Sequence, residues 1–323
     1  MTNNGSLDGG KSFSRPINDR VIFVQVLVAV LLSINFVLIA TFFMKETFYT
    51  NMRYILFANA LFSDCINLII TDLLLIFIYF SVPLQTWSCL IFFIVSSLYN
   101  YVTPLTLTAM SLERYAAICM PLHHGELCTM SRALQGILTI HSIGFIPCLV
   151  TLIVFFSSTT FIFLKQYRIC SVEVFMLYRW QDHLRSAISQ FYFLIMCIII
   201  AFSYVKIMKV AKAASGENKE STQKGLRTVI LHAFQLLLCL IQLWTPFIEA
   251  AVLQIELNLY LNVRYFNYIC FNLAPRSLSP LIYGLRDEAF VLALKRFVLC
   301  FCKTVCKTCL PEVDKEDSAL LCH

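Results

Sequence analysis

Seven long apolar stretches run through the sequence, and each is long enough to cross a lipid bilayer as a helix. They lie at about residues 21–44, 54–82, 89–118, 133–157, 186–209, 227–254 and 264–284. A spanning helix takes about 20 residues, so a chain of 323 residues has room for about seven. With 59% hydrophobic and 14% charged residues, the chain is too apolar for a water-soluble globule. The sequence therefore predicts an all-α integral membrane protein: a seven-transmembrane helix bundle over residues 21–284, preceded by a polar N-terminal segment at 1–20.

Basic residues near the ends of these stretches predict the orientation. The connections on the side of the C-terminus carry sixteen Lys and Arg residues, and those on the other side carry eight. Positive connections stay in the cytoplasm, so we expect a multi-pass protein of the plasma membrane with an extracellular N-terminus and a cytoplasmic C-terminus. The sequon Asn4-Gly5-Ser6 would then be a site of glycosylation.

The basic segment from Lys206 to Arg227 lies between the fifth and sixth stretches. It is either the charge that sets topology or a docking surface for a cytoplasmic partner. A nucleic-acid partner is not expected, because the basic residues are spread over several membrane-flanking loops instead of forming one face.

Residues 285–323 are expected to form an amphipathic helix, from Leu285 to Leu299, followed by a cytoplasmic Cys-rich tail. Apolar residues repeat at helical spacing beside basic ones, which favours a short helix lying on the inner leaflet; the apolar set is Phe290, Leu294, Phe297 and Val298, and the basic set is Arg286, Lys295 and Arg296. Four cysteines follow, and palmitoylation is the modification expected for juxtamembrane Cys; they are Cys300, Cys302, Cys306 and Cys309. A metal site is the less favoured alternative, since no His or second Cys pair with ligand spacing lies nearby.

No pattern of an enzyme stands out in the sequence. A Gly-rich phosphate loop, a His-Glu-x-x-His motif and a nucleophile elbow are all missing, so no catalytic residue, cofactor or metal is expected. A transporter would usually show repeat symmetry or a line of ionisable residues through several spans, and neither is visible.

The inner end of the third stretch carries the most informative residues, Glu113-Arg114-Tyr115. An acid beside an arginine at the membrane boundary can form a local ion pair, which reduces the desolvation cost of the guanidinium. Breaking that pair would free the five-donor fork of Arg114 for another helix or a partner backbone. The triplet alone is a weak signal, because a charge that snorkels at a helix end is common.

The residues around this triplet resemble a signature of the olfactory receptors, a branch of the rhodopsin-like G-protein-coupled receptors. That signature is Met-Ala-Tyr-Asp-Arg-Tyr-Val-Ala-Ile-Cys-x-Pro-Leu, and Glu113 stands in place of its usual Asp. The matching residues are Met110, Arg114, Tyr115, Ala117, Ile118, Cys119, Pro121 and Leu122. The resemblance implies that the protein binds an odorant and activates a heterotrimeric G protein.

Further matches occur at the family's spacing over roughly residues 20–297. Asn35 and Asp64 stand where rhodopsin-like receptors carry Asn and Asp in their first two helices. The other matching sites are Tyr54, Leu56, Asn59, Ser203, Tyr204, Lys224, Thr228, His232, the run Pro280 to Asp287, and Ala293 to Lys295. The family also implies a disulfide between Cys89 and Cys170, which would both lie in the oxidising compartment.

Two departures concern the branch of the family. Leu243-Trp244-Thr245-Pro246 is closer to the Cys-Trp-x-Pro of general rhodopsin-like receptors than to the olfactory pattern of tetrapods, and the extra cysteines of the olfactory second outer loop are missing. Both indicate a fish-type odorant receptor and leave a non-olfactory small ligand as the alternative.

Two ionisable residues, Asp64 and Arg276, lie within apolar stretches, where charge is expensive unless it has a partner. In many related receptors the Asp holds a sodium ion. We expect Arg276 to pair with Asp64 and to replace that sodium. The alternative is that backbone carbonyls freed at Pro275 and Pro280 hold Arg276.

Pro246 and Pro280 each remove a backbone hydrogen bond, so each marks a kink at which half a helix can swing. The resemblance favours a switching role over a passive kink, since Trp244 precedes one kink and Tyr283 follows the other. Trp244 would sense ligand at the floor of the pocket. Tyr204 and Tyr283 would rearrange with Arg114 at the inner face.

The ligand pocket is expected in the outer half of the bundle. Counting helical turns outward from these landmarks gives an apolar lining with a few hydroxyl and amide groups, which suits a small organic molecule; the candidates are Ser96, Ser97, Asn100, Tyr101, Ile188, Ser189, Tyr192, Phe247, Ile248, Ala251 and Asn272. The third stretch lacks the acid that amine receptors carry, which disfavours an aminergic ligand. We expect ligand binding to shift the population of bundle states, moving the inner ends of the fifth and sixth helices outward to admit the G protein.

Overall fold

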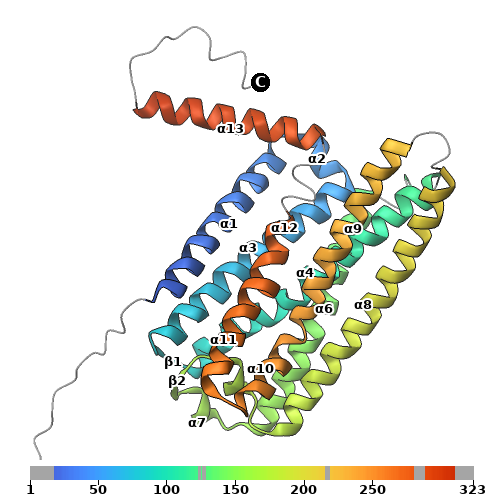
Figure 1. The fold of residues 1–323 in the computed structure, drawn as a ribbon. Helices are drawn as coiled ribbons and strands as arrows, with labels where there is room; N and C mark the ends of the chain where they lie inside the picture. The colour runs from blue at the N-terminus through green and yellow to red at the C-terminus, as the bar shows by residue number, and fades with distance from the viewer. Residues whose placement is uncertain (1–17, 123–124, 126–128, 215–218, 280–287, 310–323) are drawn as a thin grey trace, which may run out of the picture.

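A computed structural model of the protein describes residues 18–122, 125, 129–214, 219–279 and 288–309 (Figure 1). The helices of the bundle run side by side, and one further helix lies across an end. In chain order the described elements are α1 (Asp19–Phe43), α2 (Glu46–Thr50), α3 (Met52–Tyr79), β1 (Pro83–Gln85), α4 (Thr86–Cys119), α6 (Met130–Ser158), α7 (Phe161–Leu164), β2 (Tyr167–Ile169), η1 (Val172–Phe175), α8 (Arg179–Ala214), α9 (Lys219–Gln242), α10 (Thr245–Leu253), α11 (Leu257–Asn267), η2 (Tyr268–Leu273), α12 (Ala274–Ser279) and α13 (Glu288–Cys309).

Five helices in the described part of the chain are long and apolar enough to cross a membrane: α1, α3, α4, α6 and α8. The pair α9 and α10 makes a sixth span, bent by 44° at its break. The seventh expected span corresponds to α11, η2 and α12, which follow one another without a gap from Leu257 to Ser279. The predicted seven-helix bundle is therefore the architecture of the chain.

Local sequence explains where several helices begin. The side chains of Asn18 and Asn51 accept hydrogen bonds from the backbone N–H two residues later, and Thr129 accepts one from the N–H of Arg132. These are the residue types that satisfy the free donors at a helix start. Pro104 and Pro147 lie inside α4 and α6 without ending them, as neighbouring helices and Thr side chains allow within a membrane.

A two-stranded antiparallel sheet, which the all-helical expectation did not include, lies at one end of the bundle. Strand β1 pairs with β2, with Leu84 opposite Arg168. Three-residue strands are too short to show a period in the sequence. The predicted disulfide is present directly beside them: Cys89 and Cys170 are bonded, with their Cα atoms 5.4 Å apart.

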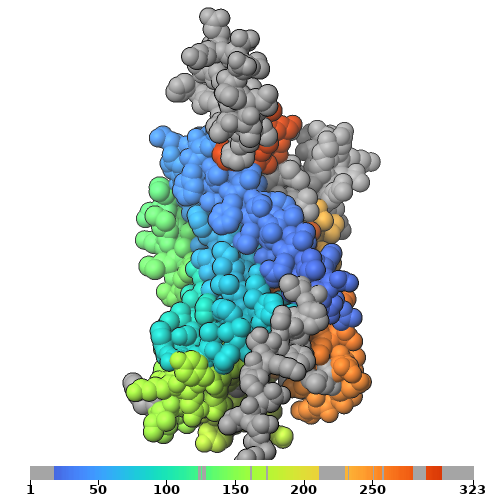
Figure 2. Space-filling view, turned by 90° about the vertical axis from the view of Figure 1, so that its left-hand side faces the viewer, coloured from blue at the N-terminus to red at the C-terminus, as the bar shows by residue number. Residues whose placement is uncertain are grey.

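The two ends of the bundle are named here by their landmarks. The sheet end carries β1, β2 and the Cys89–Cys170 disulfide, and the α13 end lies opposite it (Figure 1). In the space-filling view the yellow-green residues between α6 and α8 form the part of the bundle farthest from α13 (Figure 2). They lie at the sheet end, below the blue and cyan surface of α1, α3 and α4 in this view.

The sixth and seventh helices depart from the continuous spans that we expected. The chain makes a turn at Leu243–Trp244, just before Pro246 in the first turn of α10. In the seventh helix, Tyr268–Leu273 is π-helical and precedes Pro275, which has no N–H to donate. Prolines near both irregularities supply the physical cause.

Helix α13 crosses the end of the bundle beside α1 and α2, as Figure 1 shows. The ring of Phe290 is fully buried, with its centroid 5.3 Å from Phe48 and 5.7 Å from Phe57. Phe290 therefore fastens the start of α13 to the bundle. The helix is longer than the expected amphipathic segment at 285–299, reaching Cys309, and the side chains of Cys300, Cys302, Cys306 and Cys309 lie outside the described residues.

Close packing of α4 against α6 depends on a small residue. A Cβ placed on Gly144 would lie 2.9 Å from Cγ2 of Val102, whereas a Cβ on Gly136 of the same helix would have no atom within 4 Å. The two glycines therefore lie in the same helix but differ in their surroundings, so that substitutions at Gly136 can serve as controls for substitutions at Gly144.

We expect Gly136→Ala to raise the stability of the purified protein by up to about 1 kcal/mol, because Ala is the better helix former. Gly144→Val should lower it by about 1–3 kcal/mol through overpacking against Val102. The measurement is the apparent melting temperature of each variant in the same detergent. Equal melting temperatures for Gly144→Val and Gly136→Val would contradict the close α4–α6 approach.

Candidate functional site

A cavity of about 530 Å³ opens at the sheet end of the bundle. Its volume falls within the range of small-molecule sites, about 300–1,000 Å³. The described residues that line it are Asn18, Arg20, Val21, Val24, Thr71, Leu74, Leu75, Ile78, Tyr79, Cys89, Phe93, Ser96, Ser97, Asn100, Tyr101, Pro147, Thr151, Cys170, Ser171, Phe175, Arg185, Ser189, Gln242, Leu243, Pro246, Phe247, Leu261, Arg264, Tyr265, Tyr268 and Asn272. Because the disulfide and the residues after β2 contribute to this lining, they hold one wall of the cavity in place.

Seven of the residues expected at a ligand pocket line this cavity: Ser96, Ser97, Asn100, Tyr101, Ser189, Phe247 and Asn272. Within it, the hydroxyl groups of Tyr101 and Ser189 form a hydrogen bond of 2.7 Å between α4 and α8. Both residues are buried. This pair gives the wall between α4 and α8 a defined polar point.

The other four expected residues lie elsewhere. Ile188 lines a smaller pocket between α6 and α8, and the hydroxyl of Tyr192 donates to the carbonyl of Ile143 at 2.7 Å. Ile248 and Ala251 are exposed on the outside of the bundle. Counting turns along one continuous helix misplaced these last two, because the turn at Leu243–Trp244 changes the face that α10 presents to the cavity.

Three arginines in the lining were not among the expected pocket residues: Arg20, Arg185 and Arg264. In the sequence they lie at the ends of spans, where basic residues ordinarily set topology. A usable signal was present, since Arg185 is four residues before Ser189 and so lies on the same face of α8.

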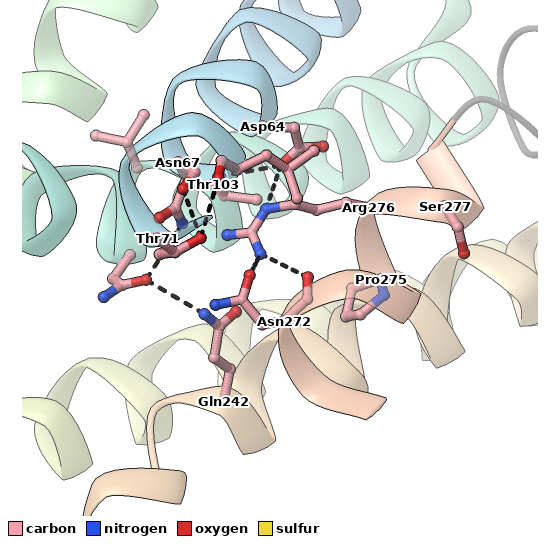
Figure 3. A network of polar contacts seen from close by, with 12 residues as sticks. Asp64, Asn67, Thr71, Thr103, Gln242, Asn272, Pro275, Arg276 and Ser277 are labelled. Atoms are coloured by element: carbon pink, nitrogen blue, oxygen red, sulfur yellow. Dashed lines mark hydrogen bonds and ion pairs between the residues drawn. The ribbon is translucent and has the colours of Figure 1, made fainter. Parts of the chain in front are cut away.

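Polar side chains form the deep wall of the cavity (Figure 3). The amide oxygen of Asn100 accepts from Asn67 and from Gln242, both at 3.2 Å, and so joins α3, α4 and α9. Thr71 donates to the carbonyl of Asn67 at 2.8 Å and lies 3.4 Å from the hydroxyl of Tyr268. Four helices therefore meet through side-chain hydrogen bonds beside the cavity.

Arg276 lies beside this wall and faces Asp64 (Figure 3). Its Nε is 3.4 Å from Oδ1 of Asp64, and both side chains are almost fully buried, at 2% and 1% exposed. Thr103 donates to the same carboxylate oxygen at 3.4 Å. The structure therefore brings together the two intramembrane charges that the sequence led us to pair.

Arg276 also bonds to a backbone carbonyl, but that carbonyl belongs to Asn272, one turn earlier in the chain, and no bond of Arg276 to a carbonyl freed at Pro275 is seen among the described residues. Nη1 of Arg276 donates to the backbone carbonyl and to the side-chain oxygen of Asn272. The carbonyl of Pro275 accepts from Gln235 at 3.1 Å. Arg276 thus joins the carboxylate of Asp64 to Asn272, which itself lines the cavity.

Asn35 lies in the same interior layer, on α1. It is 1% exposed, and its amide nitrogen and oxygen have no hydrogen-bond partner among the described residues. Its burial accords with the position that the family pattern assigned to it.

At the α13 end, the Glu113-Arg114-Tyr115 triplet lies in the last turns of α4. Glu113 is buried, and Arg114 and Tyr115 are half-buried. Tyr204 on α8 interacts electrostatically with Arg114, and the ring of Tyr115 packs on Phe202 at 5.7 Å between centroids. Helices α4 and α8 therefore meet at the triplet.

Trp244 does not lie at the floor of the cavity, where we expected it. Its side chain is 40% exposed on the outside of the bundle and packs on Phe193, with 5.7 Å between ring centroids. The turn at residues 243–244 brings Gln242, Leu243 and Pro246 to the cavity instead. Pro280 and Tyr283 lie outside the described residues, as does Asn4 of the sequon.

No group of three His, Cys, Asp or Glu side chains with the arrangement of a metal site occurs within residues 18–122, 125, 129–214, 219–279 and 288–309. The chemistry of the described cavity and core is that of binding and of charge pairing.

The bundle has a cavity at one end, a charged pair in its middle and the Glu113-Arg114-Tyr115 triplet at the other end. This is the arrangement of a membrane receptor. Residues 34–283 match the family described as 7 transmembrane receptor (rhodopsin family), and the chain belongs to this family. Over 299 residues it is 42% identical to Odorant receptor 131-2 of Danio rerio, which covers 93% of this chain and 91% of that protein. The organism of this relative agrees with the fish type that the departures around Trp244 indicated.

The Asp64–Arg276 pair can be tested by a double-mutant cycle. Breaking a buried pair by removing one partner costs about 3–5 kcal/mol, because the other charge is left uncompensated. We expect Asp64→Asn and Arg276→Gln each to lower the apparent melting temperature strongly, and the double variant to melt above both.

The half-exposed Asp182–Arg185 pair, at 3.4 Å on the surface of α8, provides the control. Asp182→Asn should change stability by less than about 1 kcal/mol. A double variant whose loss equals the sum of the two single losses would show that Asp64 and Arg276 do not interact.

Proposed function

We propose that the protein is an odorant receptor that binds a small organic molecule in the cavity at the sheet end and activates a heterotrimeric G protein at the α13 end. The observation that carries this proposal is the cavity itself, whose lining is mostly apolar with a few convergent polar groups. The 42% identity to Odorant receptor 131-2 supports the same function.

The orientation in the membrane is part of the proposal. The sheet end faces the exterior, with the N-terminus, and the α13 end faces the cytoplasm. The bonded Cys89–Cys170 pair supports this orientation, because disulfides persist in oxidising compartments. The larger number of basic residues on the side of the C-terminus supports it independently.

The residues of the deep wall offer a physical connection from the ligand to the core. Asn272 lines the cavity and also holds Nη1 of Arg276, whose Nε pairs with Asp64. A ligand that donates a hydrogen bond to the side-chain oxygen of Asn272 competes with Arg276 for that oxygen. If the ligand binds one arrangement of this network better than another, it shifts the population of the two.

Activation then moves the ends of α8 and α9 at the α13 end, and Arg114 exchanges partners there. Pro246 marks the place where α9 and α10 can change their mutual bend. Trp244 acts through packing on the outer side of the bundle, against Phe193. In this mechanism Tyr204, which interacts with Arg114, and Tyr283, beyond Pro280, are the partners that change.

Arg276 takes the place of the sodium ion that the family's carboxylate holds in other receptors. We expect agonist potency to be the same in sodium and potassium buffers of equal ionic strength. Arg276→Gln removes the internal cation from Asp64, so the variant should acquire sodium dependence, measured as a shift in half-maximal agonist concentration. Sodium dependence in the unaltered receptor would contradict the replacement.

Arg114→Ala should abolish agonist-dependent nucleotide exchange on the G protein, because it removes the donor fork that bonds the partner. Surface expression, measured by antibody labelling of intact cells, should stay unchanged. Arg132→Ala is the matched control, since Arg132 is an exposed arginine in the first turn of α6 at the same end. Retained exchange in the Arg114 variant would count against the proposed coupling site.

A ligand screen tests the odorant function directly. The receptor is expressed with an olfactory G protein and a cAMP reporter, and panels of water-borne organic molecules are applied. We expect activators whose effect disappears in cells expressing Arg114→Ala. A receptor that reaches the surface and exchanges nucleotide with no odorant class, but responds to a hormone or a lipid mediator, would identify a non-olfactory receptor instead.

A further inference from the structure

The charge of the cavity lining is unusual for a site built to take neutral odorants. Three arginines contribute to it, Arg20, Arg185 and Arg264, and no acid is present among the described lining residues. Two acids of neighbouring segments lie outside the lining: Asp72 accepts from Gln25 at 2.6 Å, and Glu249 accepts from Asn267 at 3.1 Å. Among the described residues, the lining itself therefore carries three positive charges and no negative one.

The three arginines are not equivalent. Arg20, on α1, donates to Asn262 at 2.7 Å and lies over the ring of Tyr265, and Arg264 donates to the hydroxyl of Tyr260. These contacts hold two of the guanidinium groups on the side of the cavity formed by α1 and α11. They contribute positive potential, but their donors are partly engaged.

Arg185 is different, since its side chain is 24% exposed and its Nε is buried without a hydrogen-bond partner among the described residues. It forms an ion pair with Asp182, a half-exposed residue on its own helix, through Nη2 at 3.4 Å. A buried donor without an acceptor is unfavourable. An acceptor carried by a ligand would satisfy it.

Ser189 lies one turn deeper on the same face of α8, with its hydroxyl bonded to Tyr101 at 2.7 Å. Arg185, Ser189 and Tyr101 all line the cavity, so they present a guanidinium and two hydroxyl groups to one region of it. The opposite parts of the wall are apolar and aromatic, with Phe93 and Phe247 among them. Such a site fits a molecule with an anionic head and an apolar body.

We propose that the ligand of this receptor is an organic anion, a carboxylate or a group of similar charge and shape, whose head binds Arg185 with support from Ser189 and Tyr101. The guanidinium fork matches a carboxylate in two parallel hydrogen bonds. Because Nε of Arg185 is buried, the charge of the head group contributes more to the binding free energy there than it would at the surface. This inference rests on the proposed function only in taking the cavity as the ligand site.

Three probes with the same apolar body and different charge separate the possibilities: 4-phenylbutanoate, 4-phenylbutan-1-ol and 4-phenylbutylamine. A second set with a longer chain is 6-phenylhexanoate with its alcohol and amine. Binding is measured as ligand-dependent thermal stabilisation of the purified full-length receptor without G protein. A failure of G-protein coupling therefore does not affect the result, and a failure of anion binding leaves coupling untouched.

We expect the carboxylates to bind at least about tenfold more tightly than the matched alcohols and amines. Arg185→Met should remove most of this preference, and Arg185→Lys should retain part of it, because the charge remains while the planar fork is lost. Arg179→Met is the matched control, since Arg179 is exposed at the start of the same helix and is not in the lining. That variant should keep the full preference.

Equal or weaker stabilisation by the carboxylates, including none at all, overturns the anion proposal, and the unaltered receptor alone decides this point. A preference that survives in Arg185→Met assigns the head group to other arginines and overturns the role of Arg185. Loss of the preference in Arg179→Met would show that general surface potential, and not the site at Arg185, selects the anion.

Discussion

The ion pair between Asp64 and Arg276 is the contact around which the interior of this receptor is organised. Two ionisable groups lie in the middle of an apolar bundle, where neither is tolerated without a partner. Satisfying them requires α12 to lie beside α3 at one particular height, and Thr103 of α4 completes the carboxylate's surroundings. The pair therefore sets the relative positions of three helices that apolar packing alone would leave free to slide.

A single residue connects the same pair with the ligand cavity. Asn272 belongs both to the cavity lining and to the contacts of Arg276. The π-helical segment that ends just after Asn272 and the proline at 275 disturb the regular helix there, so side chains take over the bonding of the backbone. In the proposed mechanism, a change at the cavity and a change at the charged pair are two aspects of one local rearrangement, which would supply the bistable element that long-range coupling requires.

General rules for a chain in lipid predicted much of this from the sequence. Long apolar stretches gave the bundle, and the rule that an intramembrane charge needs a partner led to Asp64 and Arg276. The Cys89–Cys170 disulfide followed from the family resemblance. Helical counting placed Asn100, Tyr101 and Ser189 correctly at the cavity, because α4 and α8 continue without a break through those residues.

Ile188 and Tyr192 were misplaced because they face α6 from the unbroken helix α8. The residues misplaced in the sixth helix share a different physical cause. Trp244, Ile248 and Ala251 follow a turn in the sixth helix, and a local break in a helix changes the face of every residue beyond it. The arginines of the cavity were missed for another reason: a basic residue at the end of a span looks the same in sequence whether it sets topology or faces a ligand. The sheet of β1 and β2 joins segments that are far apart in the sequence, beside the disulfide, and no local pattern records such pairing.

Coupling between the two ends of the bundle is the central claim, and reciprocity between ligand and G protein tests it most directly. The affinity of the receptor's most potent agonist is measured in lipid nanodiscs with and without a saturating nucleotide-free G protein. We expect the G protein to raise agonist affinity by about 5–150-fold, the usual range for coupled sites. An agonist affinity that does not change when the G protein is bound would contradict the claim that the cavity and the Arg114 end belong to one switch.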